Sequence, residues 1–429
     1  MTSRPTVSSR TVSSPTAADD ACCGEFRSVS RRGLFAGALA LAGTTTAVGS
    51  AVVTASPASA ASADSVLVVL SLRGAADGLS LVVPHGDPVY YQARPRLAIP
   101  ASQLLAKDAM FGLHPSLAPL LPLWESGRLA AVHATGLPAP NRSHFAAMEE
   151  VEDANPGSTV RQGWLNRLIG TDSGSSPLHG FNVGSGVVPG ALFGDEAVMS
   201  AGSVDDVRIP GDDEWVSKDG RKRSLHTLWD SHPGPLGKAM RSTFSALSDF
   251  QPVRATADHE DRYPNSDLGR ALATVARVVR GDVGVQVLTV DQGDWDMHSG
   301  LGTLEWGQML RNADDLATSV AAFMDDLGSQ ASKVTLLVLS EFGRRTVEND
   351  NYGLDHGYGN VMFVAGRGVK GGTVHGRWPG LTLDDDADLL VTTDYRSVLA
   401  EIVSTRFGSS TATVFPGFTP TPVGLMSTL

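Results

Sequence analysis

The feature of this sequence that most constrains its fold is a series of short apolar runs alternating with segments of helical spacing. The runs are rich in β-branched residues and cover residues 66–72, 129–134, 283–290, 334–339 and 361–365. Continuous apolar runs of this length are typical of strands buried on both faces of a parallel sheet. Apolar residues recur at helical spacing between them, in residues 117–125, 145–151, 268–279, 304–327 and 395–403. The alternation predicts an α/β fold, with a doubly wound, mostly parallel sheet and helices on both faces.

The chain has 429 residues, a length that allows two or three domains or one large α/β domain. Because strands and helices alternate along most of residues 61–429, we expect a single α/β domain there. The stretch at about 170–264 differs, since it is loop-rich and carries glycine and serine clusters. We interpret this stretch as an insertion or cap over the sheet edge.

The first sixty residues have the pattern of an export signal. Paired arginines at Arg31 and Arg32 precede Gly-Leu-Phe, an apolar stretch runs over about 33–55, and Ala58-Ser59-Ala60 follows. This order predicts a twin-arginine signal peptide over residues 1–60, recognised by the twin-arginine translocase. The expected location is extracellular or in the cell envelope. The alternative, a permanent membrane anchor, is weakened by the glycines and threonines in the apolar stretch, and no second run could span a bilayer.

Composition excludes several classes of function. The 46 acidic residues outnumber the 34 basic ones, which gives a formal net charge of −12 and argues against nucleic-acid binding. The two cysteines, Cys22 and Cys23, both precede the expected cleavage site. A disulfide scaffold, an iron–sulfur cluster and a thiolate zinc site are therefore excluded from the mature protein.

Candidate metal ligands follow two of the predicted strands. Asp294 and His298 come after the 283–290 run, four residues apart, so one helical turn or a tight loop could direct both at one ion. His356 precedes the 361–365 run, and Asp355 beside it could orient an imidazole. A carboxylate with imidazoles suits Zn²⁺ or Mn²⁺. The alternatives are a helix-capping aspartate with a surface histidine, and an ordinary turn.

Further polar residues follow two other runs. Glu341 after the 334–339 run is a candidate oxygen ligand, and Arg344 beside it a candidate clamp for an oxyanion. A Glu–Arg ion pair on a solvated loop is the alternative. After the 66–72 run, Asp77 is a further candidate ligand and Arg73 a candidate anion contact, although turn chemistry explains both equally well.

Ser143 occupies the expected N-cap position of the helix that follows the 129–134 run. A helix N-terminus offers free N–H groups and a positive dipole end, which suit a phosphate, a sulfate or an activated alkoxide. Near a metal, Ser143 is a candidate nucleophile. Its alternative role is that of a plain N-cap.

Six motifs in this order resemble an exported bacterial family known as domain of unknown function 1501, of the alkaline phosphatase/sulfatase superfamily. They are Leu72–Gly78, Asn141–Phe145, Ser340–Arg344, Asp355–Gly357, Lys370–Gly372 and Thr393–Arg396. The resemblance covers about residues 64–420. It implies an alkaline phosphatase-like doubly wound sheet.

The resemblance also implies roles for single residues. Asp294, His298 and His356 match the superfamily's first metal site in spacing and order, and Ser143 matches its nucleophile. The second metal site is incomplete, because Arg73 stands where the first strand should end in aspartate and Phe342 replaces a histidine. The modified Cys/Ser-x-Pro-x-Arg setting of the sulfatases is absent, which favours phosphoester chemistry.

Two functional hypotheses follow. In the first, the protein is an exported hydrolase of phosphate esters, or less favourably of sulfate esters, in which one divalent metal activates Ser143 or water. Arg73 or Arg142 would bind the non-bridging oxygens of a small anionic ester. In the second, it is a secreted binding or assembly protein that keeps the scaffold without turnover. The replacement at Phe342 motivates this alternative.

Overall fold

The computed structural model describes residues 45–48, 51–54, 62–172, 176–184, 187–209, 220–384 and 386–427. The predicted leader at 1–60 lies mostly outside these ranges and stays a prediction. By contacts the chain divides into Met1–Gly43 and a second unit, Thr44–Leu429, to which everything below refers. No helix of the described residues is both long enough and apolar enough to cross a membrane.

The main element is an eleven-stranded sheet with the order β1-β2-β8-β7-β9-β3-β10-β11-β6-β12, in which β13 also pairs with β6. A separate pair is formed by β4 and β5. The bounds are β1 Thr45–Val48, β2 Ala51–Thr54, β3 Val66–Leu72, β4 Val82–Val83, β5 Gly112–Leu113, β6 Leu129–Gly136, β7 Gly180–Val183, β8 Met199–Ala201, β9 Val287–Gln292, β10 Val334–Leu339, β11 Asn360–Gly366, β12 Val374–His375 and β13 Thr393–Asp394.

The centre of the sheet is parallel, as the continuous apolar runs predict. Strand β3 pairs in parallel with β9 on one side, where Leu67 lies opposite Val287, and with β10 on the other, where Leu67 lies opposite Thr335. Strand β11 differs, because it is antiparallel to both β10 and β6. The sheet is therefore mixed and mostly parallel.

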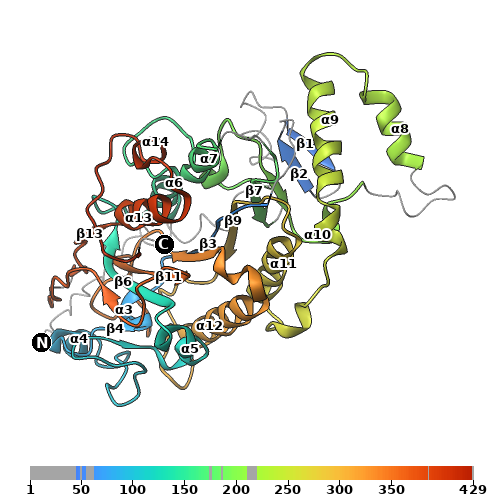
Figure 1. Ribbon diagram of the computed structural model, residues 1–429. Coiled ribbons are helices and arrows are strands. Elements are labelled where there is room, and N and C mark those ends of the chain that lie inside the picture. The colour runs from blue at the N-terminus through green and yellow to red at the C-terminus, as the bar shows by residue number, and fades with distance from the viewer. Residues whose placement is uncertain are drawn as a thin grey trace, which may run out of the picture. The chain divides into compact units, whose positions relative to one another are not determined.

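Helices cover both faces of this sheet, and β3 shows why. Its residues alternate between two hydrophobic clusters, so that Val68 and Leu70 lie in one while Leu67 and Val69 lie in the other. The first cluster includes α11 (Asp267–Gly281) and α12 (Gln308–Asp326). The second includes α6 (His144–Asp153), α7 (Trp164–Ile169) and α13 (Tyr395–Phe407). Figure 1 shows these two groups of helices on either side of the strands.

The other helices are short or lie at the periphery. The remaining α-helices are α3 Gly78–Leu81, α4 Pro88–Ala93, α5 Leu121–Glu125, α8 Gly220–Trp229, α9 Gly234–Asp249, α10 Gln251–Ala255 and α14 Thr411–Val414. The 3-10 helices are η1 Pro115–Leu120, η2 Gly190–Leu192, η3 Val204–Asp206, η4 Glu260–Arg262 and η5 Gly328–Ser332. All five predicted helical segments coincide with helices of the structure within a few residues at each end.

The region interpreted as an insertion, about 170–264, contributes to the sheet itself. Strand β7 pairs in parallel with β9 and with β8, and β8 pairs with β2. Helices α8, α9 and α10 also belong to this region, and no side chain of α8 is buried. The two strands β1 and β2 fall within the predicted leader and extend the same sheet, because β2 pairs with β8 and β1 pairs with β2.

The sheet order brings distant loops to one edge. Strands β9, β3 and β10 are mutually parallel, so the loops after their carboxyl ends emerge together. Strand β6 shares this direction, because both it and β10 are antiparallel to β11. The segment between β10 and β11 therefore turns at the same edge, and so does the start of helix α6 after β6.

Two buried histidines make a testable contribution to the pH dependence of folding. Burial lowers the pKa of His133 to about 4 and that of His114 to about 4, below the ordinary value of about 6.5. His133 is held neutral between the carbonyl of Val82 and the N–H of Ala134, both at 3.0 Å from its ring nitrogens. Above pH 6.5 neither the folded nor the unfolded chain protonates these rings.

Below pH 6.5 the unfolded chain takes up two protons that the folded chain cannot. We expect the free energy of unfolding to fall between pH 6.5 and 4 by about 1.4 kcal/mol per pH unit for each ring. Denaturant titrations at several pH values measure this slope. The variant His133→Phe should lose about half of it, whereas His232→Phe, at an exposed position, should keep it. An unchanged slope in His133→Phe would contradict the assignment.

Candidate metal centre

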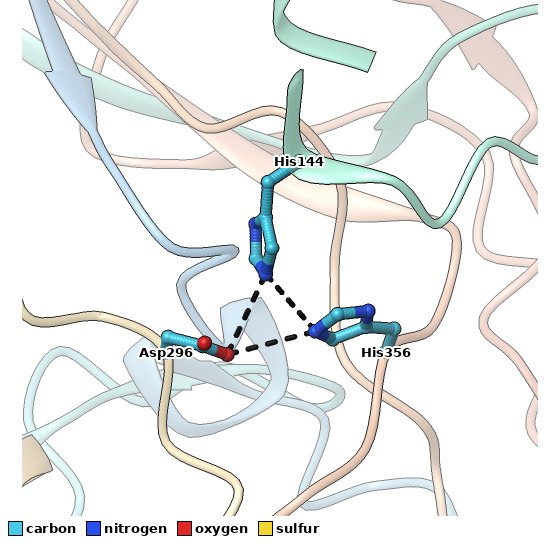
Figure 2. Close-up of side chains that lie close together, drawn as sticks. All are labelled: His144, Asp296 and His356. Carbon is cyan, nitrogen blue, oxygen red and sulfur yellow. Dashed lines mark hydrogen bonds and ion pairs between the residues drawn. The ribbon is translucent and has the colours of Figure 1, made fainter. Parts of the chain in front are cut away.

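Four side chains from three segments converge at the edge of the sheet described above. His144 is the first residue of α6, Asp296 and His298 lie in the loop after β9, and His356 lies between β10 and β11. The Nε2 atom of His356 is 3.0 Å from that of His144 and 2.8 Å from that of His298. Asp296 Oδ1 lies 3.6, 3.2 and 3.5 Å from the Nε2 atoms of His144, His298 and His356. Figure 2 shows three of the four side chains pointing at one another.

The Nδ1 atom of each of the three imidazoles faces a hydrogen-bond acceptor outside the cluster. His144 Nδ1 lies 2.8 Å from Glu341 Oε1, and His298 Nδ1 lies 3.0 Å from Asp355 Oδ1. His356 Nδ1 lies 2.9 Å from the backbone carbonyl oxygen of Arg142. Because carboxylates and carbonyls only accept, all three Nδ1 atoms donate a proton. Neutral rings then turn the lone pair of Nε2 inward.

This arrangement fits a divalent cation. Three inward lone pairs and a carboxylate oxygen repel one another at these distances unless a positive charge lies among them. Imidazole nitrogen and carboxylate oxygen suit Zn²⁺ and Mn²⁺, and outer acceptors on the ligating histidines are the usual accompaniment of such sites. Of the described residues, His144, Asp296 and His356 form the group whose donor atoms all lie within 4.8 Å of one another, and His298 adjoins it.

The pKa values of the cluster residues reflect the carboxylates gathered around the imidazoles. Burial opposes ionisation of His144, yet its bonds to Asp296 and Glu341 raise its pKa to about 9. Burial also opposes the charge on Asp296, but the three histidines and Arg344 hold its pKa well below the ordinary range. The pKa of His356, by contrast, is lowered, first by burial and then by the neighbouring positive charges. The cluster thus favours one positive charge at its centre, carried by the His144 imidazolium or by a metal ion in its place.

Arg344 holds together the loops on which the cluster is built. Its guanidinium is fully buried and donates to the carbonyls of Gly74, Ala75 and Leu354 at 2.5, 2.7 and 2.9 Å. A further bond of 2.6 Å reaches Asp296 Oδ1. The side chain therefore joins the loops after β3, β9 and β10, and it aims the carboxylate of Asp296 at the imidazoles.

One side of the cluster is accessible to solvent. The side chains of Asp296 and His298 are 32% and 31% exposed, whereas those of His144 and His356 are only 8% and 10% exposed. A small molecule or water would approach from the side of the loop after β9. The buried side is closed by Phe342, whose ring centroid lies 5.0 Å from that of His144 and 5.1 Å from that of His356.

The structure brings His298 and His356 together, as the sequence predicts, but Asp296 rather than Asp294 joins them. Asp294 has a left-handed φ of 65° and an exposed side chain. The four-residue spacing of Asp294 and His298 assumes a helical turn, whereas residues 293–297 form an irregular loop without helix. In this loop Asp296 and His298, two residues apart, both reach the cluster, as alternate residues of an extended chain do.

The sequence pattern does not identify His144 as a ligand, because the expected N-cap position belongs to its neighbour Ser143. Ser143 is the N-cap of α6, is exposed, and makes no side-chain capping bond; its N–H donates to Asn141 Oδ1 at 3.1 Å. His144 is its direct neighbour and points inward. The sequence feature that could have identified His144 is a histidine directly after an N-cap serine, at the edge of the sheet where the parallel strands end.

The other predicted ligands lie around the cluster or outside it. Glu341 is 2% exposed, and its Oε1 accepts from the N–H of Gly74 at 2.9 Å as well as bonding His144. It thus orients a ligand in this structure. Asp77 is not brought to the cluster: it is buried in an ion pair with Arg94, whose nitrogens lie 2.5 and 3.0 Å from its oxygens.

The predicted anion-binding arginines differ in accessibility. Arg73 pairs with Glu152 at 2.7 Å and with Asp291 at 3.0 Å, and Arg344 is fully buried. Arg142 is 42% exposed and pairs with Asp388. Its backbone carbonyl oxygen also accepts from His356 Nδ1, so the backbone of Arg142 lies beside the cluster.

Comparison with known families places the whole site inside one match. Residues 64–405 match the family described as "Protein of unknown function (DUF1501)". The chain belongs to this family. Every ligand candidate and every outer acceptor lies within the matched DUF1501 segment. No curated protein matches the chain.

The placement of Asp77 yields a first test. Asp77→Asn leaves Arg94 buried without its counter-charge, so the free energy of unfolding should fall by about 3 kcal/mol. The metal content of the folded protein should stay that of the unchanged protein. Asp267→Asn, which removes a surface ion pair with Arg270, should change neither. Loss of metal from folded Asp77→Asn would instead make Asp77 a ligand.

The outer acceptors give a second test. Glu341→Gln and Asp355→Asn should each weaken metal binding by about 10–100-fold, because each leaves an imidazole less firmly oriented. Competition with a chelator, followed by metal analysis, measures the affinity. Asp386→Asn, at an exposed residue that pairs with Arg345, is the matched control. Equal affinities in all four proteins would show that these carboxylates do not support the cluster.

Proposed function

We propose that this DUF1501 chain is a metal-dependent hydrolase of phosphate esters, with one divalent cation, zinc or manganese, held by His144, Asp296, His298 and His356. The observation that carries the proposal is the inward direction of the three Nε2 atoms, each fixed by an outer acceptor on Nδ1. A divalent cation in such a site supplies Lewis acidity and positive charge for a phosphoryl oxygen. Sulfate esters are the weaker substrate class.

The chain's own residues supply the remaining parts of the proposed reaction. Ser143, exposed at the start of α6, stands beside the ligand His144 and is our candidate nucleophile, with water as the alternative. The free N–H groups of the first turn of α6 favour an anion there. Among the predicted arginines we favour Arg142 for binding a non-bridging oxygen, because its side chain is 42% exposed, whereas those of Arg73 and Arg344 are 19% and 0% exposed.

The kinship with the alkaline phosphatase/sulfatase superfamily is part of this proposal. Supporting it are the parallel centre β9-β3-β10 and the position of the cluster at the carboxyl ends of those strands. Export through the twin-arginine pathway, to the cell envelope or beyond, is likewise proposed from the leader sequence. The proposed partner is a small anionic ester.

A second candidate function is a secreted binding protein that holds a metal without turnover. The packing of Phe342 against His144 and His356 favours it, because this apolar ring fills the place where a second metal ligand would be needed. Such a protein would gain thermal stability from metal but release no product. One metal site, and not two, is common to both candidates.

Hydrolysis assays distinguish the two candidates. The full protein is loaded with Zn²⁺ or Mn²⁺ and supplied with 4-nitrophenyl phosphate, bis(4-nitrophenyl) phosphate and 4-nitrophenyl sulfate. We expect phosphate ester turnover with about one metal per chain, and loss of both metal and turnover in His356→Ala. No turnover of any ester by a protein that retains its metal would favour the binding protein.

The role of Ser143 is tested in the same assay. Ser143→Ala should retain the metal and lose at least about 10²-fold in rate if the hydroxyl is the nucleophile. Ser410→Ala is the matched control, since Ser410 is also an exposed N-cap without a side-chain capping bond, at the start of α14. Turnover that is unchanged in Ser143→Ala would assign the attack to water.

A further inference from the structure

Two large aromatic side chains are exposed on the loops that carry the metal ligands. Trp306 is 46% exposed and Tyr352 is 37% exposed. Their ring centroids are 5.5 Å apart and the ring planes meet at 63°, so the two rings pack edge to face against each other. Two such rings together, rather than one scattered apolar residue, need an explanation.

The backbone connects this pair to the cluster. Trp306 lies on the loop that follows His298, and Tyr352 lies shortly before Asp355 and His356. The two loops bond each other, from the N–H of Gly300 to the carbonyl of Asn351 at 3.0 Å and from the N–H of Gly302 to the carbonyl of Tyr352 at 3.3 Å. A Cβ atom on Gly353 would meet the carbonyl oxygen of His298 at 2.1 Å. The residue after Tyr352 thus packs directly on the backbone of a ligand.

Tyr352 is held in a costly conformation. Its φ of 53° lies in the left-handed region, which bulky side chains avoid at a cost of roughly 1–3 kcal/mol. The turn around it is braced by Asn349, whose Oδ1 accepts from the N–H groups of Asn351 and Gly353 at 3.0 and 3.1 Å and whose Nδ2 donates to the carbonyl of His298 at 2.8 Å. The Arg96 guanidinium lies 4.7 Å from the centre of the tyrosine ring. Backbone strain of this kind is concentrated at active sites and at residues that contact ligands.

From this we infer that Trp306 and Tyr352 form a subsite that binds an aromatic ring of the substrate, next to the metal centre that takes its phosphate group. The inference rests on the proposed function and specifies its substrate class as an aryl-bearing phosphate ester. Face and edge contacts between aromatic rings contribute about 0.5–1.5 kcal/mol each beyond the area that they bury. The two contacts together correspond to roughly a tenfold gain in affinity for an aryl over an alkyl compound.

Binding of two phosphonates, which are not hydrolysed, tests the subsite without any turnover. Titration calorimetry on the metal-loaded protein compares phenylphosphonate with methylphosphonate. We expect phenylphosphonate to bind about tenfold more tightly. Trp306→Ala and Tyr352→Asn should each lower this preference to about threefold and leave methylphosphonate binding and metal content unchanged. Asparagine tolerates the left-handed backbone, so this variant removes the ring while keeping the turn.

Trp229→Ala is the matched control, because Trp229 is a half-buried tryptophan on α8, a helix that carries no residue of the cluster. It should keep the full preference for phenylphosphonate. Equal binding of the two phosphonates, a preference that stays undiminished in both variants, or failure of either phosphonate to bind would each overturn the subsite. A preference that depends on Trp306 would support the subsite even in a protein without ester hydrolysis, in which case only the proposed catalysis fails.

Discussion

The buried guanidinium of Arg344 is the interaction on which the rest of the site depends. It has no contact with solvent and satisfies carbonyls from the loops after β3 and after β10, together with the carboxylate of Asp296. A buried cation without partners destabilises a protein more than almost any other group. These loops therefore cannot separate without exposing the guanidinium or leaving it buried without hydrogen-bond partners. The same contacts position Asp296. Folding of the sheet edge and assembly of the cluster are therefore one event.

The charges around this edge follow from the arrangement of the cluster. Glu341 and Asp355 hold the outer nitrogens of two histidines, and the lowered pKa values of both carboxyls keep them ionised. Their charge is offset by hydrogen bonds rather than by surface lysines, since Glu341 is almost fully buried. The result is a cluster whose donor atoms are already aligned by these carboxylates. Little reorganisation is then needed for a cation to enter, which favours binding.

The sequence predicts the layers of this fold because burial on both faces leaves continuous apolar runs, such as 66–72 and 334–339, which coincide with β3 and β10. The sequence does not reveal that β11 is antiparallel to its neighbours. The direction of a strand depends on the connection that leads into it and not on its own apolar residues. At the site, periodicity assigns residues only within regular elements. Asp296 and His144 lie in an irregular loop and at a helix start, where spacing does not say which of two neighbours points inward.

The separation of the donors along the chain has a consequence for metal loading. The Nε2 atoms of His144 and His356 lie 3.0 Å apart, although the two residues are 212 positions apart in the chain and strands β7, β8, β9 and β10 come between them. A nascent or extended polypeptide therefore lacks the proposed coordination sphere, and the proposed ion would be captured only by the folded chain. With the twin-arginine leader predicted at residues 1–60, folding precedes translocation, so the cytoplasmic metal pool, and not that outside the membrane, would decide which ion the protein carries.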